Sequence, residues 1–136
     1  MKYSYFEHPS DIGILCRGSS LQELFKNATA ALYEIMLDTK LTGETEQKEI
    51  IISAEDTAEL FAQWVGDIIF YAHAYKLFFK RFDFEIINET EVKAVAHGQI
   101  ITGDAKLRSE IKGMTYHNYT FTKKKEFWEA SFIIDV

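Results

Sequence analysis

Hydrophobic residues recur at intervals of three and four in two stretches of the chain, which is the spacing of one helical face. The first stretch follows Ser20, which forms a capping-box pattern with Glu23 three residues later. This pattern predicts a long amphipathic helix over residues 20–37. A second capped pattern predicts another helix, which begins at Asp56 and ends near Tyr75.

Elsewhere polar and apolar residues alternate, which is typical of β-strands with one buried face. Six or seven such strands are expected in one mainly antiparallel sheet, over Tyr3–Glu7, Ile12–Arg17, Glu49–Ser53, residues 81–86 and 92–97, Met114–Thr122 and residues 128–134. Helices and a one-sided sheet bury their apolar surfaces best against one another. The predicted fold is therefore α+β, a two-layer sandwich of a mainly antiparallel sheet packed against two long helices.

Composition narrows the class of protein. The 136 residues are 47% hydrophobic and 15% aromatic, enough for one core, and no boundary divides them, so residues 1–136 are expected to form a single domain. The formal charge of −6 opposes autonomous binding to nucleic acid. No apolar stretch predicts a membrane span and no signal peptide is apparent, so a cytoplasmic protein is expected. Cys16, the only cysteine, is expected to be a buried small hydrophobe.

Polar residues gather at the end of the first predicted strand. Pro9 cannot donate a hydrogen bond in a central strand, so we expect His8, Ser10 and Asp11 to leave the sheet together at a bend. Polar side chains can converge at such a bend and bind a metal ion. A Ser-Asp turn that bonds its own backbone is the alternative.

The end of the sequence carries a second anionic feature. The apolar strand stops on Asp135 and then on the terminal carboxylate of Val136. If this strand pairs near the first one, Asp11, Asp135 and the Val136 main chain would supply hard oxygen ligands for Ca²⁺ or Mg²⁺. Carboxylates held close together repel each other unless a cation neutralises them.

A third segment, Glu110–His117, enters a predicted strand with Lys112 and His117. The two side chains are five positions apart, so they point to opposite faces unless a bulge intervenes. This spacing counts against a Lys–His catalytic dyad. A glycine-rich phosphate loop, a nucleophile elbow and a His-Glu-x-x-His motif are all absent from the sequence. These residues alone therefore indicate an acidic α+β domain with a candidate oxygen-ligated cation site.

Several segments together resemble the archease family. Tyr5–Ile14 is similar to the family's N-terminal motif, a hydrophobic residue followed by [Asp/Glu]-His-Thr-Ala-Asp-[Val/Ile]-Gly. The helix that follows carries the family's Leu-x-x-Leu-Phe-x-Asn-Ala. Glu55–Trp64 resembles the start of its second helix. Glu110–His117 resembles its Glu-[Val/Ile]-Lys-Ala-[Val/Ile/Met]-Thr-Tyr-His segment, and Ile133–Val136 its closing hydrophobic-Asp-[Ile/Val]. The resemblance covers essentially the whole chain.

The resemblance implies an accessory protein, not an enzyme. Archeases promote guanylylation and multiple turnover of RtcB-type RNA ligases in tRNA splicing and RNA repair, so RNA would be reached through the ligase. The resemblance also implies a divalent cation, usually calcium, at Asp11, Asp135 and the main-chain oxygen of Val136. It assigns Lys112 to the ligase interface, and it places His8 and His117 in matched motifs.

The sequence departs from the family pattern at two places. Pro9-Ser10 replaces the common Thr-Ala, and Gly113 replaces Ala, and both changes concern the local backbone geometry. Two other functions stay open. A metal-dependent phosphohydrolase would need an activated water and a positioned base, and a chaperone or modulator of a tRNA methyltransferase would need exposed apolar surface.

Overall fold

The computed structural model describes residues 1–103 and 105–136, and within them two helices and seven strands. The helices are α1 (Leu21–Met36) and α2 (Thr57–Tyr75). The strands are β1 (Tyr3–His8), β2 (Asp11–Gly18), β3 (Glu46–Ser53), β4 (Leu77–Ile87), β5 (Glu91–Ile100), β6 (Gly113–Lys123) and β7 (Trp128–Asp135). Every strand predicted from alternation is present, most of them longer by a few residues.

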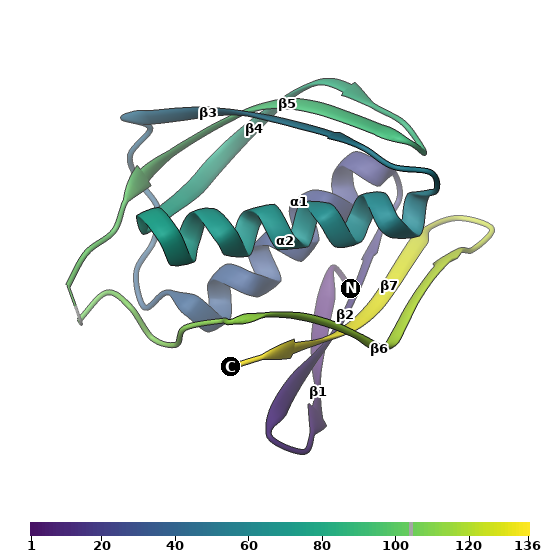
Figure 1. The fold of residues 1–136 in the computed structure, drawn as a ribbon, viewed down its shortest axis with the longest axis horizontal. Coiled ribbons are helices and arrows are strands. Elements are labelled where there is room, and N and C mark those ends of the chain that lie inside the picture. Colours follow the sequence, from purple (N-terminus) through teal and green to yellow (C-terminus); the bar gives the residue numbers. More distant parts are fainter. Residues whose placement is uncertain (104) are drawn as a thin grey trace.

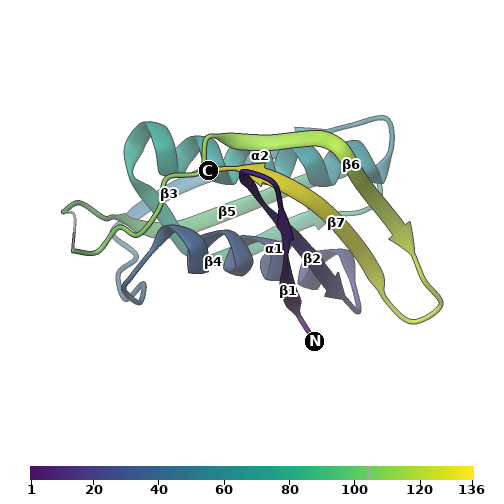
Figure 2. The same cartoon turned by 90° about the horizontal axis from the view of Figure 1, so that it is seen from below.

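The strands form two antiparallel sheets, with the orders β1-β2-β7-β6 and β3-β5-β4. Figure 1 shows the three-stranded sheet above the helices and the four-stranded sheet below them, and each helix contacts both sheets. In Figure 2 the four-stranded sheet lies in front of the helices. The predicted α+β class, the antiparallel pairing and the two long helices are confirmed, whereas the strands divide over two sheets instead of forming one.

Local capping signals fix where the helices begin. The Ser20 hydroxyl accepts a hydrogen bond from the Glu23 N–H at 3.1 Å, and the Asp56 carboxylate accepts one from the Glu59 N–H at 2.8 Å. Helix α2 ends at Tyr75, because the next residue, Lys76, has a left-handed φ of 53° that stops the helical path. The predicted bounds of both helices are therefore confirmed to within one residue.

Aromatic side chains of the helices fill the space between the sheets. Trp64 of α2 is fully buried, and its indole N–H lies 3.2 Å from the Phe25 carbonyl oxygen and 3.1 Å from the Thr29 hydroxyl. Phe61 contacts Phe25 of α1 and Phe132 of β7, each with ring centroids 5.6 Å apart. These contacts tie both helices to the four-stranded sheet, which carries the residues of functional interest.

Cys16 of β2 is buried in this core, as predicted. Burial raises the pKa of its thiol to about 12, so the thiol stays protonated at neutral pH. Neither helix of the described chain is long and apolar enough to cross a membrane.

Candidate cation and partner site

The hairpin between β1 and β2 turns through two residues, Pro9 and Ser10. Proline fixes the first turn position and Ser10 has a φ of 65°, the combination that a type II turn requires. His8 and Asp11 form the last register pair of the hairpin. The expectation that His8 and Asp11 leave the sheet with Ser10 is therefore wrong. Pro9 lies in the turn itself, where no strand hydrogen bond is required of it, so only Pro9 and Ser10 leave the sheet.

Asp11 stands opposite Asp135 in the β2–β7 register, and Asp135 stands opposite Gly113 in the β7–β6 register. His8, Asp11 and Asp135 therefore form a row across three neighbouring strands. The Lys112 backbone N–H donates a hydrogen bond to the Asp135 carbonyl oxygen at 2.8 Å. The fold thus brings together residues from both ends of the sequence and from the segment before β6.

The row lies on the sheet face that points away from the helices. Ile14, Phe132 and Ile134 belong to the core, and strand side chains alternate between faces. Asp11 and Asp135 differ from these core residues by an odd number of positions along their strands, so their carboxylates face outward. Directly opposed residues have Cβ atoms about 5 Å apart, and like charges at that separation repel.

The imidazole of His8 and the carboxylate of Asp11 are neighbours but do not form a hydrogen bond. The distance between His8 Nδ1 and Asp11 Oδ2 is 3.6 Å, with about a quarter of each side chain exposed. His8 Nδ1 itself is buried and has no hydrogen-bond partner, a condition found at no other buried side-chain nitrogen or oxygen of the described residues.

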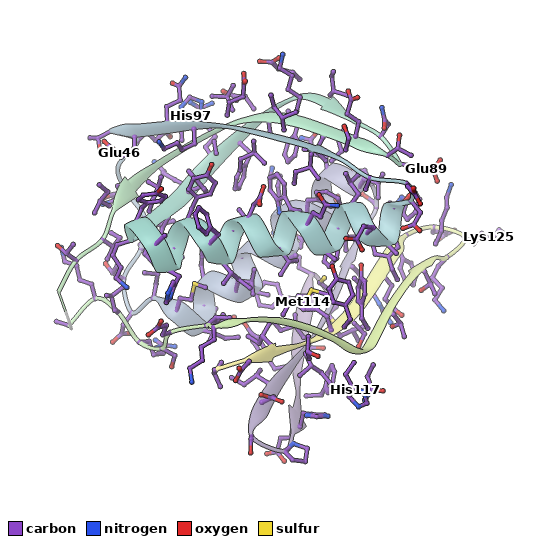
Figure 3. All side chains as sticks on the ribbon, in the orientation of Figure 1. Glu46, Glu89, His97, Met114, His117 and Lys125 are labelled. Carbon is purple, nitrogen blue, oxygen red and sulfur yellow. The ribbon has the colours of Figure 1, made fainter. Side chains whose placement is uncertain are left out.

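An irregularity in β6 brings His117 to the same place. Thr115 pairs with Ile133, but the next pair joins Thr120 to Ser131, so residues 116–119 lie opposite Phe132 alone. Figure 3 shows His117 beside the β1–β2 hairpin, and the His8 and His117 rings meet edge to face with centroids 6.3 Å apart. These extra residues form a bulge in β6. Without a bulge, strand alternation would point Lys112 and His117 to opposite faces of the sheet.

Apolar side chains adjoin the carboxylates on this outer face. Ile133 is only 1% exposed although it alternates with the core residues on either side of it. The Phe6 ring covers Gly13, where an added Cβ would lie 2.1 Å from a ring atom, and 40% of Phe6 remains exposed. A hollow of about 740 Å³ lies at the hairpin, lined by Tyr5, Phe6, Glu7, His8, Pro9, Asp11 and Ile12. Sequence reasoning missed Phe6 and Ile133, although the consecutive apolar residues Tyr5-Phe6 and Phe132-Ile133-Ile134 break the alternation and were the available signal of a partly apolar outer face.

Side chains alone do not form a complete metal centre. Within residues 1–103 and 105–136, no three His, Cys, Asp or Glu side chains are grouped closely enough to hold a metal ion. Asp135 and Val136 are both exposed. The set of Asp11, Asp135 and the Val136 main-chain oxygen stays a prediction, with the register of the strands in its favour.

Comparison with known proteins gives a consistent result over nearly the whole chain. The profile of the Archease protein family (MTH1598/TM1083) matches residues 3–136. Protein archease of Methanosarcina acetivorans is 33% identical over 141 residues, covering 99% of this chain and 96% of the relative. Protein archease of Sulfurisphaera tokodaii is 29% identical, with 99% of each chain covered.

Two solved structures share the fold. Protein 1598 of Methanobacterium thermoautotrophicum superposes with a TM-score of 0.82 at 26% identity, covering 98% of both chains. A Thermotoga maritima protein described as an archease and possible chaperone gives a TM-score of 0.71 at 26% identity, covering 96% of this chain and 94% of its own. The family profile, the sequence relatives and the shared fold together establish that this chain belongs to the archease family.

Proposed function

We propose that this chain activates an RNA ligase of the RtcB type by promoting its guanylylation and multiple turnover, without catalysing ligation itself. The observation that supports this most strongly is the meeting of Asp11, Asp135 and Lys112 at one edge of an exposed sheet face. They come from three separate segments, each of which matches a family motif. A role in tRNA splicing and RNA repair agrees with the cytoplasmic location expected from the sequence.

A divalent cation at this edge is part of the proposal. Two carboxylates opposed in register are stabilised when a cation lies between them, and oxygen donors favour calcium. Asp11, Asp135 and the main-chain oxygen of Val136 would hold the ion. The orphaned buried nitrogen of His8 beside Asp11 is consistent with a ligand at this place. The cation would supply positive charge at the surface that meets the ligase.

Lys112 would supply the second charged contact. Its side chain is exposed while its backbone N–H is held by Asp135, so the ammonium group extends from a fixed position. An ammonium on a flexible stem can reach a phosphate or an acidic group of a partner. The half-exposed Phe6 next to the carboxylates gives the same surface an apolar component that a protein partner can cover.

A reconstituted guanylylation assay tests the proposal. An RtcB-type ligase is incubated with GTP and metal ion, with and without this protein, and covalent nucleotide loading and multiple-turnover ligation are measured. We expect stimulation by the wild type, and loss of most of it with Asp11→Ala and with Asp135→Ala while both variants stay folded. Normal stimulation by both folded variants contradicts the role of the cation site.

Two further measurements separate the alternatives. Phosphodiester and nucleotide substrates incubated with the isolated protein and metal ion should remain intact, whereas turnover would favour a phosphohydrolase. The Thermotoga maritima relative is described as a possible chaperone, which supports the alternative of a chaperone or modulator of a tRNA methyltransferase. Stimulation of a tRNA methyltransferase in place of the ligase would favour that role.

A further inference from the structure

One flank of α2 carries large aromatic side chains that lie open to solvent. In Figure 1, α2 lies in front of α1 and between the two sheets, and no other helix or strand of the described chain passes in front of it. Gly66, Phe70 and Ala74 follow one another at every fourth position along this flank, and all three are exposed. Phe70 is 52% exposed, and Tyr75, the last residue of the helix, is 56% exposed. Neighbouring aromatic residues this exposed form an apolar patch of the kind that marks interaction sites.

The exposed rings belong to one cluster that the core holds in place. The Phe70 ring meets the Tyr71 and Tyr75 rings edge to face, with centroids 5.6 and 5.8 Å apart, and Tyr71 and Tyr75 are separated by 6.2 Å. Tyr71 also contacts the buried Phe79 of β4, with centroids 5.5 Å apart. The rings are therefore ordered before a partner binds, which lowers the entropy cost of binding.

A carboxylate without a cation lies beside these rings. Asp67 precedes Tyr71 by one helical turn and is only partly exposed. Among the described residues it has no hydrogen-bond or ion-pair partner, and burial raises the pKa of its carboxyl above the usual value. Burial, followed by the nearby charges of Asp67 and Tyr75, also raises the pKa of Tyr71, so the carboxylate and the rings interact. The fold thus leaves a poorly solvated negative charge at the edge of the aromatic cluster.

We propose that this flank of α2 is a docking site for an arginine side chain carried by a helical segment of a partner protein. Three features of the flank attract a cation: the Asp67 carboxylate, the electron-rich faces of the rings, and the carbonyl end of the helix dipole at Tyr75. Arginine fits them better than lysine, because its planar guanidinium stacks on aromatic rings and can pair with a carboxylate through two hydrogen bonds.

Gly66 indicates that the partner approaches closely. Glycine is among the least favourable residues inside a helix, and an added Cβ at Gly66 would meet nothing within 4 Å, so the fold does not require glycine there. A second backbone lying against this turn does require it, because a side chain would hold the two apart. A partner helix beside α2 therefore accounts for both the glycine and the exposed Phe70.

A second copy of this chain does not supply the arginine. The arginines of the sequence are Arg17, Arg81 and Arg108. Each is already in an ion pair, with Glu129 at 2.6 Å, Glu44 at 2.9 Å and Asp38 at 2.7 Å, respectively. The occupant that the charges favour is a different protein with an unpaired arginine on its surface.

The test uses synthetic helical peptides of about 18 residues, built from Ala, Leu and Gln with arginine at the centre. Two matched peptides carry lysine, or the uncharged analogue citrulline, in its place. Titrated into the ¹⁵N-labelled full chain, the arginine peptide should shift the amide signals of Gly66, Phe70 and Tyr75. Its dissociation constant should be about 5-fold or more below that of the citrulline peptide, with the lysine peptide between them.

Variants of the flank assign the binding to its residues. Phe70→Ala and Asp67→Asn should each weaken binding of the arginine peptide about 5-fold, and in Asp67→Asn the arginine and citrulline peptides should bind more nearly alike. Gly66→Ala should weaken all three peptides. Tyr116→Ala is the matched control, because Tyr116 is also an exposed tyrosine beside a carboxylate, that of Glu59 at 3.3 Å, and it should bind the arginine peptide normally.

Three outcomes overturn the inference. Equal binding of the arginine and citrulline peptides removes the role of the cation, and signal shifts confined to another surface remove the site. Sedimentation that shows a dimer of the wild type, lost in Phe70→Ala, makes a second copy the occupant instead. Circular dichroism confirms that each variant is folded. No ligase takes part in these measurements, so their failure leaves the proposed function untouched.

Discussion

Replacing Asp11 with asparagine should change stability in opposite directions in the presence and absence of a cation. Asp11 and Asp135 are directly opposed in an antiparallel pair, where like charges destabilise by about 0.2–1 kcal/mol. Asn keeps the size and the backbone and removes one charge. Without a cation, Asp11→Asn should therefore be as stable as the wild type or more stable by up to about 1 kcal/mol.

The size of the effect follows from the chain length. An unfolding entropy of about 2.1 cal/mol/K per residue gives about 0.29 kcal/mol/K for 136 residues, so 1 kcal/mol shifts Tm by about 3.5 °C. A cation at one hundred times its Kd stabilises the folded state by about 2.7 kcal/mol, or about 9 °C. Wild type should gain this shift and Asp11→Asn should gain little of it, so the order of the two melting temperatures reverses.

Differential scanning calorimetry at pH 8, in chelator and in excess Ca²⁺, measures both effects. Asp83→Asn is the matched control, because this carboxylate accepts hydrogen bonds from Arg81 at 2.6 and 2.7 Å on the other sheet. Its Tm should fall slightly and by the same amount in both buffers. A wild type that is the more stable protein in chelator, and that gains nothing from cation, would refute the reasoning.

Other predictions concern the backbone, the thiol and the lysine. Gly66→Ala should raise Tm by about 3 °C, because the position is exposed within α2 and an added Cβ meets nothing within 4 Å. Gly98→Ala should lower stability by about 1–3 kcal/mol, because its Cβ would lie 2.0 Å from the Phe78 carbonyl oxygen. Native Cys16 should resist thiol reagents at pH 8 and react on denaturation, since burial raises its pKa to about 12. Lys112→Ala should unfold within about 0.5 kcal/mol of the wild type yet stimulate ligase guanylylation less, with Lys112→Arg as the test of charge alone.

The helices could be predicted closely because their signals are local. The residues that cap each helix lie within one turn of the backbone groups they satisfy, so Ser20 and Asp56 marked the true starts. The division into two sheets could not be predicted in the same way, since alternation shows that a strand has two faces but not which strand lies beside it. One signal was present in α2, where Ala62 and Ile69 are buried outside the main apolar stripe, as expected of a helix covered on two sides.

The residues of the candidate site could be predicted from their chemical type. Their contacts could not be predicted where these depend on which strands pair and in which register. The sequence predicted that Asp11 and Asp135 lie close only if the first and last strands are near each other. In the structure β2 and β7 are adjacent strands, and Asp11 pairs with Asp135. The approach of His117 to His8 required extra residues in β6, and no glycine or proline marks them in residues 116–119. The parity of Lys112 and His117 was taken as evidence against a shared face, and the signal that was overlooked is Asn118, a residue type that tolerates the positive φ of 58° found there.

The two departures from the family motif can now be assessed from the backbone. Pro9-Ser10 replaces Thr-Ala, but the positive φ of Ser10 is confined to the turn, and the next pair, His8 with Asp11, remains in register. Gly113 replaces Ala at the start of β6, where an added Cβ would meet nothing within 4 Å, so the fold does not demand glycine there. Because neither change displaces the strands that hold Asp11 and Asp135, the charged row is a property of the sheet and should tolerate variation in the turn.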